Sequence, residues 1–162
     1  MKLINIQTSD GETIEVEWVA AQQSQIIRKI LEDLSIGENI IPISNEKVTG
    51  PIFKKALVWM ENNRGYPDFL QDIDDDNLKE KRWNQLNEWE NQYIEMTVDD
   101  MIPLLVCGNF LEIKGLVSLI IRAVALKING KRSEGIPSEE EIRKTYQIED
   151  PKLLRQLRTF LD

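Results

Sequence analysis

Carboxylates that alternate along one short stretch are the side chains of this sequence best spaced for metal chemistry. Asp72, Asp74 and Asp76 stand two residues apart, which is the spacing of the first oxygen ligands in a calcium-binding loop. Such a loop needs a glycine directly after the third of these ligands and a bidentate glutamate at its end. Asn77 and Trp83 stand there instead. The pattern therefore favours a solvated acidic loop, and we predict no metal site.

Other groups that commonly carry catalysis are few. The chain holds no histidine, which is the commonest general base and metal ligand. Its single cysteine, Cys107, excludes an intramolecular disulfide and a cysteine zinc cluster. Asp99 and Asp100 are adjacent carboxylates, but they follow Thr97 as acidic residues follow a helix N-cap. We predict that the protein is not an enzyme and has no catalytic residue and no cofactor.

The composition favours a chain that works through other proteins. Its 162 residues suit one domain, or one domain with a helical extension. A formal net charge of -8 disfavours nucleic acid, whose phosphates need clustered lysine and arginine. Arg122 and Lys127 interrupt the most apolar stretch, so we predict no bilayer-spanning segment. The N-terminus lacks the apolar core of a signal peptide, so we expect an intracellular protein.

A small β-sheet is predicted near the N-terminus to carry the rest of the fold. Residues 3–7 and 13–16 alternate apolar and polar side chains around a turn at 9–11, which predicts a β-hairpin. Residues 40–43 form a short apolar run, and its Pro42 is tolerated at a sheet edge. We therefore expect a third strand there.

Helices are predicted around this sheet, which gives an α+β fold class. Apolar residues with helical spacing mark 20–34, and Pro51 at a first helical position opens a helix that reaches Met60. The apolar face of that second helix is predicted at Ile52, Phe53, Ala56, Leu57 and Met60. Residues 63–87 lose periodicity and predict a mobile acidic loop.

A further helix is predicted after Thr97, which has the residue type of an N-cap. It runs from Met101 to Phe110 and contains Pro103. Proline lacks the backbone donor that a helix interior needs. The sequence leaves two outcomes open, a kink at Pro103 or a later helix start at Ile102.

Residues 116–128 form the most apolar helix that the sequence predicts. Ser118, Arg122 and Lys127 are its only polar side chains, and the first two lie close together on a helix with about 100° per residue. Apolar side chains therefore cover most of its circumference. Two interpretations remain open: the chain's own elements wrap the helix, or another chain covers it.

Two amphipathic helices are predicted at the C-terminal end. Ser138 and Glu141 form a capping-box pattern for a helix through Tyr146, and Asp150 with Pro151 provides the N-cap and first position of the last helix. The apolar face of this last helix consists of Leu153, Leu154, Leu157, Phe160 and Leu161. Packing on the body of the protein stays open, but we expect a partner to bury this face.

The segment 109–116, Asn-Phe-Leu-Glu-Ile-Lys-Gly-Leu, resembles the Asn-Tyr-Leu-Asp-Ile-Lys-Gly-Leu signature of the Skp family. This family comprises the adaptor subunits of SCF (Skp, cullin, F-box) ubiquitin ligases. Further blocks look like those of the family and follow in the same order, among them 23–24, 89–94 and 141–146. The resemblance covers almost the whole chain.

The resemblance implies a BTB/POZ fold over residues 1–128 and a helical extension that binds F-box proteins over 129–162. In the family, the first part docks the N-terminal region of a cullin, and the extension wraps the F-box of a substrate receptor. The implied cullin contacts are Ile102, Leu105, Asn109 and Phe110. The implied F-box contacts are Val117, Ile121, Val124, Ile128, Ile142, Tyr146, Ile148, Leu154, Leu157 and Phe160.

The implied function is therefore that of a non-catalytic adaptor that brings receptor-bound substrates to ubiquitination, in the cytoplasm and nucleus. A BTB-type interaction or dimerisation module outside a ubiquitin ligase remains the alternative, and a homodimer of the free chain stays open. Pro103, Phe110 in place of the usual tyrosine, and the long 128–142 connection depart from the family pattern. These departures suggest a divergent paralogue with its own F-box preference.

Overall fold

A three-stranded sheet with helices around it forms from the residues that the computed structural model describes. These residues are 2–33, 40–63, 86–131 and 138–161. The arrangement confirms the predicted α+β class. The acidic run at 72–76, most of the predicted loop at 63–87 and the question of a calcium site lie outside the described residues.

The sheet is built around its first strand. β1 (Leu3–Gln7) pairs antiparallel with β2 (Thr13–Glu17) and parallel with β3 (Ile40–Pro42). Ile4 and Ile6 alternate into the core, as the period of a half-buried strand requires. β3 is an edge strand, where a proline is tolerated. The predicted hairpin and third strand are confirmed.

The helix predicted over 20–34 is confirmed over 25–33 and wrong at its start, where the helix breaks. α1 (Trp18–Ala21) ends early, and α2 (Gln25–Asp33) begins anew after Ser24. The Ser24 hydroxyl accepts a hydrogen bond from the Ile27 N–H at 3.1 Å, which caps the start of α2. Apolar spacing alone overran this break, because it does not register a capping side chain.

α3 (Gly50–Asn62) is tied to the β-hairpin at its first turn. Asp10, in the hairpin turn, accepts a hydrogen bond from the Gly50 N–H at 3.0 Å. The Thr8 hydroxyl and then this N–H hold the pKa of Asp10 below its ordinary value. Pro51 lies in the first turn, as predicted.

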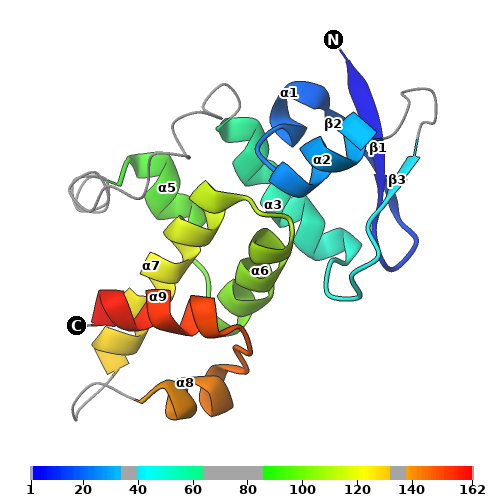
Figure 1. Cartoon of the computed structure of the whole chain (residues 1–162). Helices are drawn as coiled ribbons and strands as arrows, with labels where there is room; N and C mark the ends of the chain where they lie inside the picture. Colours follow the sequence, from blue (N-terminus) through cyan, green and yellow to red (C-terminus); the bar gives the residue numbers. More distant parts are fainter. Residues whose placement is uncertain (1, 34–39, 64–85, 132–137, 162) are drawn as a thin grey trace.

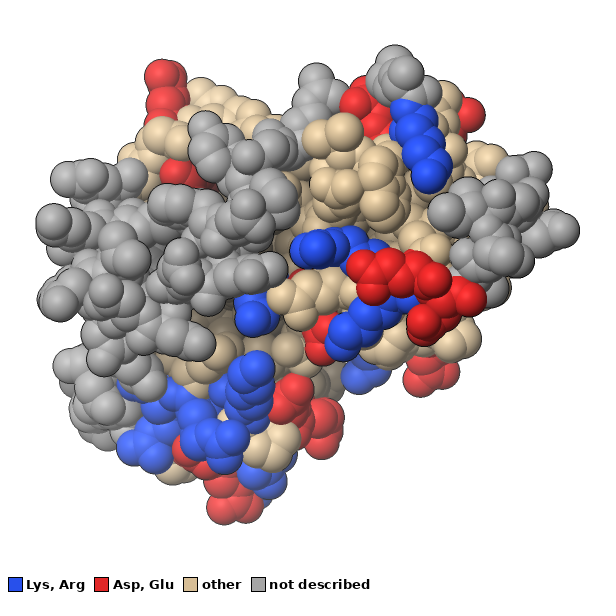
Figure 2. All heavy atoms as spheres, turned by 45° about the horizontal axis from the view of Figure 1, so that its top comes forward, with Lys and Arg blue, Asp and Glu red and all other residues tan. Residues whose placement is uncertain are grey.

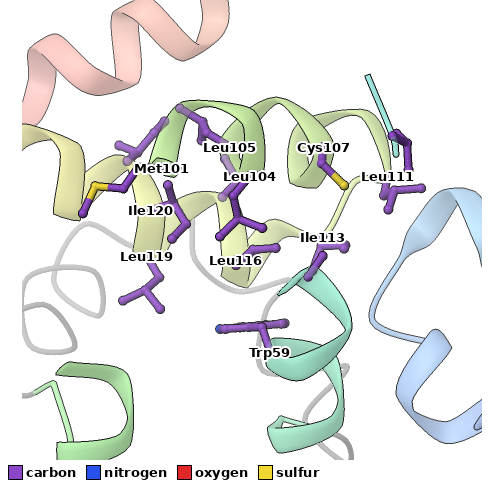
Figure 3. Close-up of a cluster of buried hydrophobic side chains, with 14 of the residues drawn as sticks. Trp59, Met101, Leu104, Leu105, Cys107, Leu111, Ile113, Leu116, Leu119 and Ile120 are labelled. Carbon is purple, nitrogen blue, oxygen red and sulfur yellow. The ribbon is translucent and has the colours of Figure 1, made fainter. Parts of the chain in front are cut away.

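One apolar core includes residues of the sheet and of the helices around it, among them α3, α6 (Val98–Phe110) and α7 (Lys114–Lys131). Phe53, Ala56 and Met60 of α3 are buried, as predicted, and Trp59, which the predicted face left out, is buried with them. Figure 3 shows the Trp59 ring below Ile113 and Leu116 of the α6–α7 region. Ile52 and Leu57, which the sequence assigned to the buried face, are only partly buried against the core.

α6 follows α5 (Glu88–Tyr93) and begins at Val98. The Thr97 hydroxyl accepts a hydrogen bond from the Asp100 N–H at 3.2 Å, which confirms the predicted N-cap. The alternative start at Ile102 is wrong, because Pro103 lies inside α6. Pro103 is exposed and cannot donate to the carbonyl four residues earlier, so the helix lacks one of its own hydrogen bonds there.

The C-terminal helices lie at the end of the molecule opposite the sheet (Figure 1). α7 leads to α8 (Glu139–Tyr146), and α9 (Pro151–Leu161) then packs back on α7. The boundary predicted after Ile128 falls within α7, which runs on to Lys131.

Lysine and arginine stand beside acidic side chains on the face drawn in Figure 2, instead of forming one continuous basic field. Within the described ranges, no helix has the length and apolar character that crossing a bilayer requires.

Candidate protein-binding site

Four residues of α6 were predicted as one contact surface, and the structure divides them by exposure. Ile102, Asn109 and Phe110 are half-buried, whereas Leu105 is fully buried. Figure 3 draws Leu105 among the core side chains of α6. Leu105 therefore offers no surface to a partner in this conformation. The other three keep part of their side chains accessible.

The turn between α6 and α7 is held in one conformation by backbone hydrogen bonds. The Ile113 N–H donates to the Gly108 carbonyl at 2.9 Å, and Glu112 takes a positive φ of 53°. This is the pattern of a helix end closed by a left-handed residue. The segment that resembles the family signature thus includes a rigid helix-to-helix turn.

The same turn is fixed to α2. The Ser24 hydroxyl donates to the Leu111 carbonyl at 2.6 Å, and both groups are buried. Lys29 of α2 also lies 3.7 Å from Glu112, with both side chains substantially exposed. Such an exposed ion pair contributes little. The Gln25 and Ile26 N–H groups also donate to the Glu112 and Leu111 carbonyls, at 3.3 and 3.4 Å, so hydrogen bonds from the start of α2 are the main tie. The C-terminal end of α6, with Asn109 and Phe110, is therefore rigidly placed.

Asn109 reaches in the other direction to the start of α9. Its side-chain Nδ2 donates to Asp150 Oδ2 at 2.9 Å, in a partly buried position. The other oxygen, Asp150 Oδ1, accepts from the Lys152 N–H at 2.8 Å and so caps α9. One carboxylate thus joins a residue of the predicted cullin set to the helix that carries part of the predicted F-box set.

α7 is covered by elements of its own chain. Its predicted contact residues Val117, Ile121, Val124 and Ile128 are all at most 9% exposed. Of the two interpretations that the sequence left open for this helix, the structure has the one in which neighbouring helices wrap it. Leu126 is the exception among its large apolar side chains, at 50% exposure.

The apolar face of α9, which we expected a partner to bury, packs on α7 and α8 of the same chain. Leu154 and Leu157 are fully buried, and Leu153 and Leu161 are nearly so. Phe160 is half-buried, and the Arg122 guanidinium of α7 lies 5.4 Å from the centre of its ring, within the range of a cation–π contact. Of the two alternatives that the sequence left for this face, the structure has packing on the body, and not the favoured burial by a partner.

α8 and the residues after it hold the remaining predicted contacts. Ile142 and Ile148 are buried, whereas Tyr146 is half-buried. The Ser138 hydroxyl accepts from the Glu141 N–H at 3.2 Å, which confirms Ser138 as the N-cap and is one half of the predicted capping box. Arg158 of α9 lies 3.9 Å from Glu139 of α8. α7, α8 and α9 therefore bring most of the predicted F-box residues into one apolar cluster.

Cys107, Asp99 and Asp100, which the sequence offered as groups that could take part in catalysis, occupy positions that fit a structural role. Burial raises the pKa of the Cys107 thiol to about 12, so this thiol is protonated at neutral pH. Asp99 and Asp100 lie in the first turn of α6, where they favour the helix start. Within the part of the chain that the structure describes, no three metal-binding side chains gather closely enough to hold an ion.

Comparisons with known proteins extend over nearly the whole chain. A model described as the Skp1 family, tetramerisation domain, matches residues 2–65. The chain is 32% identical over 147 residues to the E3 ubiquitin ligase complex SCF subunit sconC of Talaromyces marneffei, which covers 91% of this chain and 85% of that protein. The proteins of the same name from Talaromyces stipitatus and Arthroderma benhamiae are each 31% identical over 91% of this chain, and over 85% and 84% of their own lengths.

Proposed function

The chain belongs to the Skp1 family, and from this premise we propose that it is the adaptor subunit of an SCF ubiquitin ligase. The observation that carries the proposal is the similarity to SCF subunits over 91% of the chain. In this function the protein binds a cullin with one surface and an F-box substrate receptor with another. It thereby raises the concentration of substrate near the ligase without catalysing a step itself.

The cullin is proposed to bind the accessible side chains of Ile102, Asn109 and Phe110 on α6. Two apolar side chains beside one polar amide suit an interface in which hydrophobic contacts give affinity and a hydrogen bond fixes the register. Leu105 supports this surface from the core. The tie from Ser24 to Leu111 keeps the surface in place before a partner arrives.

The F-box receptor is proposed to bind the cluster formed by α7, α8 and α9. The predicted contacts on α7 are buried, and α9 packs on this helix. On α9 itself Leu154 and Leu157 are buried and Phe160 is half-buried. While α7 and α9 bury these residues against the chain itself, the same residues cannot contact an F-box receptor. A receptor that uses both must therefore move α9 away from α7, and part of its binding energy is spent on that step.

A binding assay with the full chain, a cullin N-terminal domain and an F-box peptide tests the proposed function. Each partner should bind alone, and all three components should elute together as one complex. Binding of neither partner would contradict the adaptor function. Binding of the F-box peptide without the cullin would remove the bridge, with Pro103 and Phe110 as the first residues to revert to the family pattern.

The movement of α9 can be followed by methyl NMR. We expect nuclear Overhauser contacts between α7 and α9 to disappear when the F-box peptide binds. Contacts between α6 and α7 serve as the control and should persist, because this pair forms the core. Retention of the α7–α9 contacts at saturating peptide would mean that the receptor binds elsewhere on the chain.

Self-association is a second candidate function, supported by the description of the matching family model as a tetramerisation domain. Sedimentation of the free chain tests it, since a module that works by assembly should remain oligomeric and bind neither SCF partner. We also propose that the protein acts in the cytoplasm and nucleus, which imaging of a tagged chain would check.

A further inference from the structure

The Asn109 amide is held in one orientation by its partner. A carboxylate only accepts hydrogen bonds, whereas a side-chain amide has a donor end and an acceptor end. Asp150 Oδ2 therefore selects the Nδ2 end of Asn109, and the two atoms lie 2.9 Å apart. The carbonyl Oδ1 of Asn109 must then point to the other side of the amide. An asparagine without such a partner would sample both orientations.

The two oxygens of Asp150 have separate partners. Oδ1 binds the Lys152 N–H and caps α9, while Oδ2 binds Asn109. A cap needs only one acceptor oxygen, which serine and asparagine also supply. The second oxygen is thus available to orient Asn109.

We propose that Asp150 is a positioning residue for the cullin contact, because it fixes which end of the Asn109 amide faces the partner. This inference rests on the proposed function. Asp150 is not among the expected contacts for either partner, so it would act only through Asn109. Its bond lies at the first turn of α9, so it can persist while the later turns separate from α7.

Asp150→Asn separates the positioning role from the capping role. The new amide can cap α9 with its oxygen as well as aspartate does, but it then presents an NH2 group to Asn109. Two donors face each other, so the Asn109 amide must turn round or lose its bond. We expect cullin binding about three- to tenfold weaker, from the loss of one pre-ordered side chain, with an unchanged melting temperature.

Two further variants make the test specific. Ser138→Ala removes the equivalent cap of α8, whose hydrogen bond is 3.2 Å long, and leaves the Asn109–Asp150 bond in place. It should bind the cullin N-terminal domain as tightly as the natural chain. Asp150→Ala loses both the cap and the tie, so it should weaken cullin binding and lower the melting temperature. The side-chain amide signals of Asn109 in a nitrogen-15 spectrum should shift in both Asp150 variants and stay in place in Ser138→Ala.

The outcomes separate this inference from the proposed function. If the natural chain binds no cullin, the proposed function fails and the inference falls with it. If the natural chain binds and Asp150→Asn binds equally well, only the inference is overturned. Equal weakening by Ser138→Ala would also overturn it, because the effect would then follow from the stability of the extension.

Discussion

Ser24 and Asp150 show how one short polar side chain can fix two elements at once. Ser24 caps α2 and donates to the Leu111 carbonyl at the end of α6. Asp150 caps α9 and accepts a hydrogen bond from Asn109 of α6. The C-terminal end of α6 is thus held from two sides, by the hydrogen bond from Ser24 and by the one to Asp150. These bonds restrict the movement of its accessible side chains.

Gln147 ends α8 with a left-handed backbone, at a φ of 56°. Side chains other than glycine pay about 1 kcal/mol or more for this conformation. We expect Gln147→Gly to raise the free energy of unfolding by about 0.5–1 kcal/mol, measured by urea denaturation. Gln22→Gly is the matched control, because Gln22 ends α1 at a φ of -61°. There glycine should be destabilising by a similar amount, and the same sign at both positions would contradict the backbone explanation.

At the scale of elements, α7 is buried by one helix that precedes it in the sequence and one that follows it. α6 precedes it and α9 follows it, and both pack along it. Figure 1 shows α9 crossing α7 at the end away from the sheet. An almost entirely apolar helix is stable in this position because little of its surface meets water.

Ile121 and Leu126 test whether α7 is covered in solution. Ile121 is 1% exposed and Leu126 is 50% exposed on the same helix. We expect Ile121→Ala to lower the free energy of unfolding by about 2–4 kcal/mol through the lost contacts and the cavity. Leu126→Ala should cost less than about 1 kcal/mol. Urea denaturation measures both, and similar small losses would show that α7 lies open in the free chain.

Local signals predicted the elements better than their packing. The alternation at 3–7 and 13–16 and the caps at Thr97 and Ser138 depend on neighbouring residues, so the sequence predicts them. The break at Ser24 was missed, because apolar spacing continued across it. The burial of the α9 face was also missed, since spacing tells which side of a helix is apolar but not what covers it. The ties from Ser24 and Asp150 join residues 87 and 41 positions apart, which no local pattern reports.

At the scale of the whole molecule, the pKa of the Cys107 thiol depends on whether the core around it stays closed to water. Cys107 is the only cysteine of the chain and is fully buried on α6, and Figure 3 shows it in line with Leu104 and Leu111. Burial raises its pKa to about 12. Tyr93 has a raised pKa as well, through burial and then through the nearby Cys107 charge.

Stability should therefore fall in alkali. The folded state holds the Cys107 proton more tightly than the unfolded chain, whose thiol has an ordinary pKa near 9.0. The stabilisation is fully present below about pH 9 and is lost as pH rises towards 12. We expect the urea midpoint to decline above about pH 9. In Cys107→Ala the decline should begin later, near the ordinary pKa of tyrosine at about 10; an onset that does not move would exclude the thiol as its cause.

The packing of α9 on α7 also affects how the protein behaves between partners. A bare helix with apolar side chains around most of its circumference would favour aggregation and chance association. α9 covers this helix and belongs to the same chain, so its effective concentration at α7 is higher than that of a free peptide. An incoming segment must bury more apolar surface than α9 does before it can replace α9. On the proposed function, a weakly hydrophobic segment would therefore fail to replace α9, and only a receptor with a larger apolar surface would bind α7.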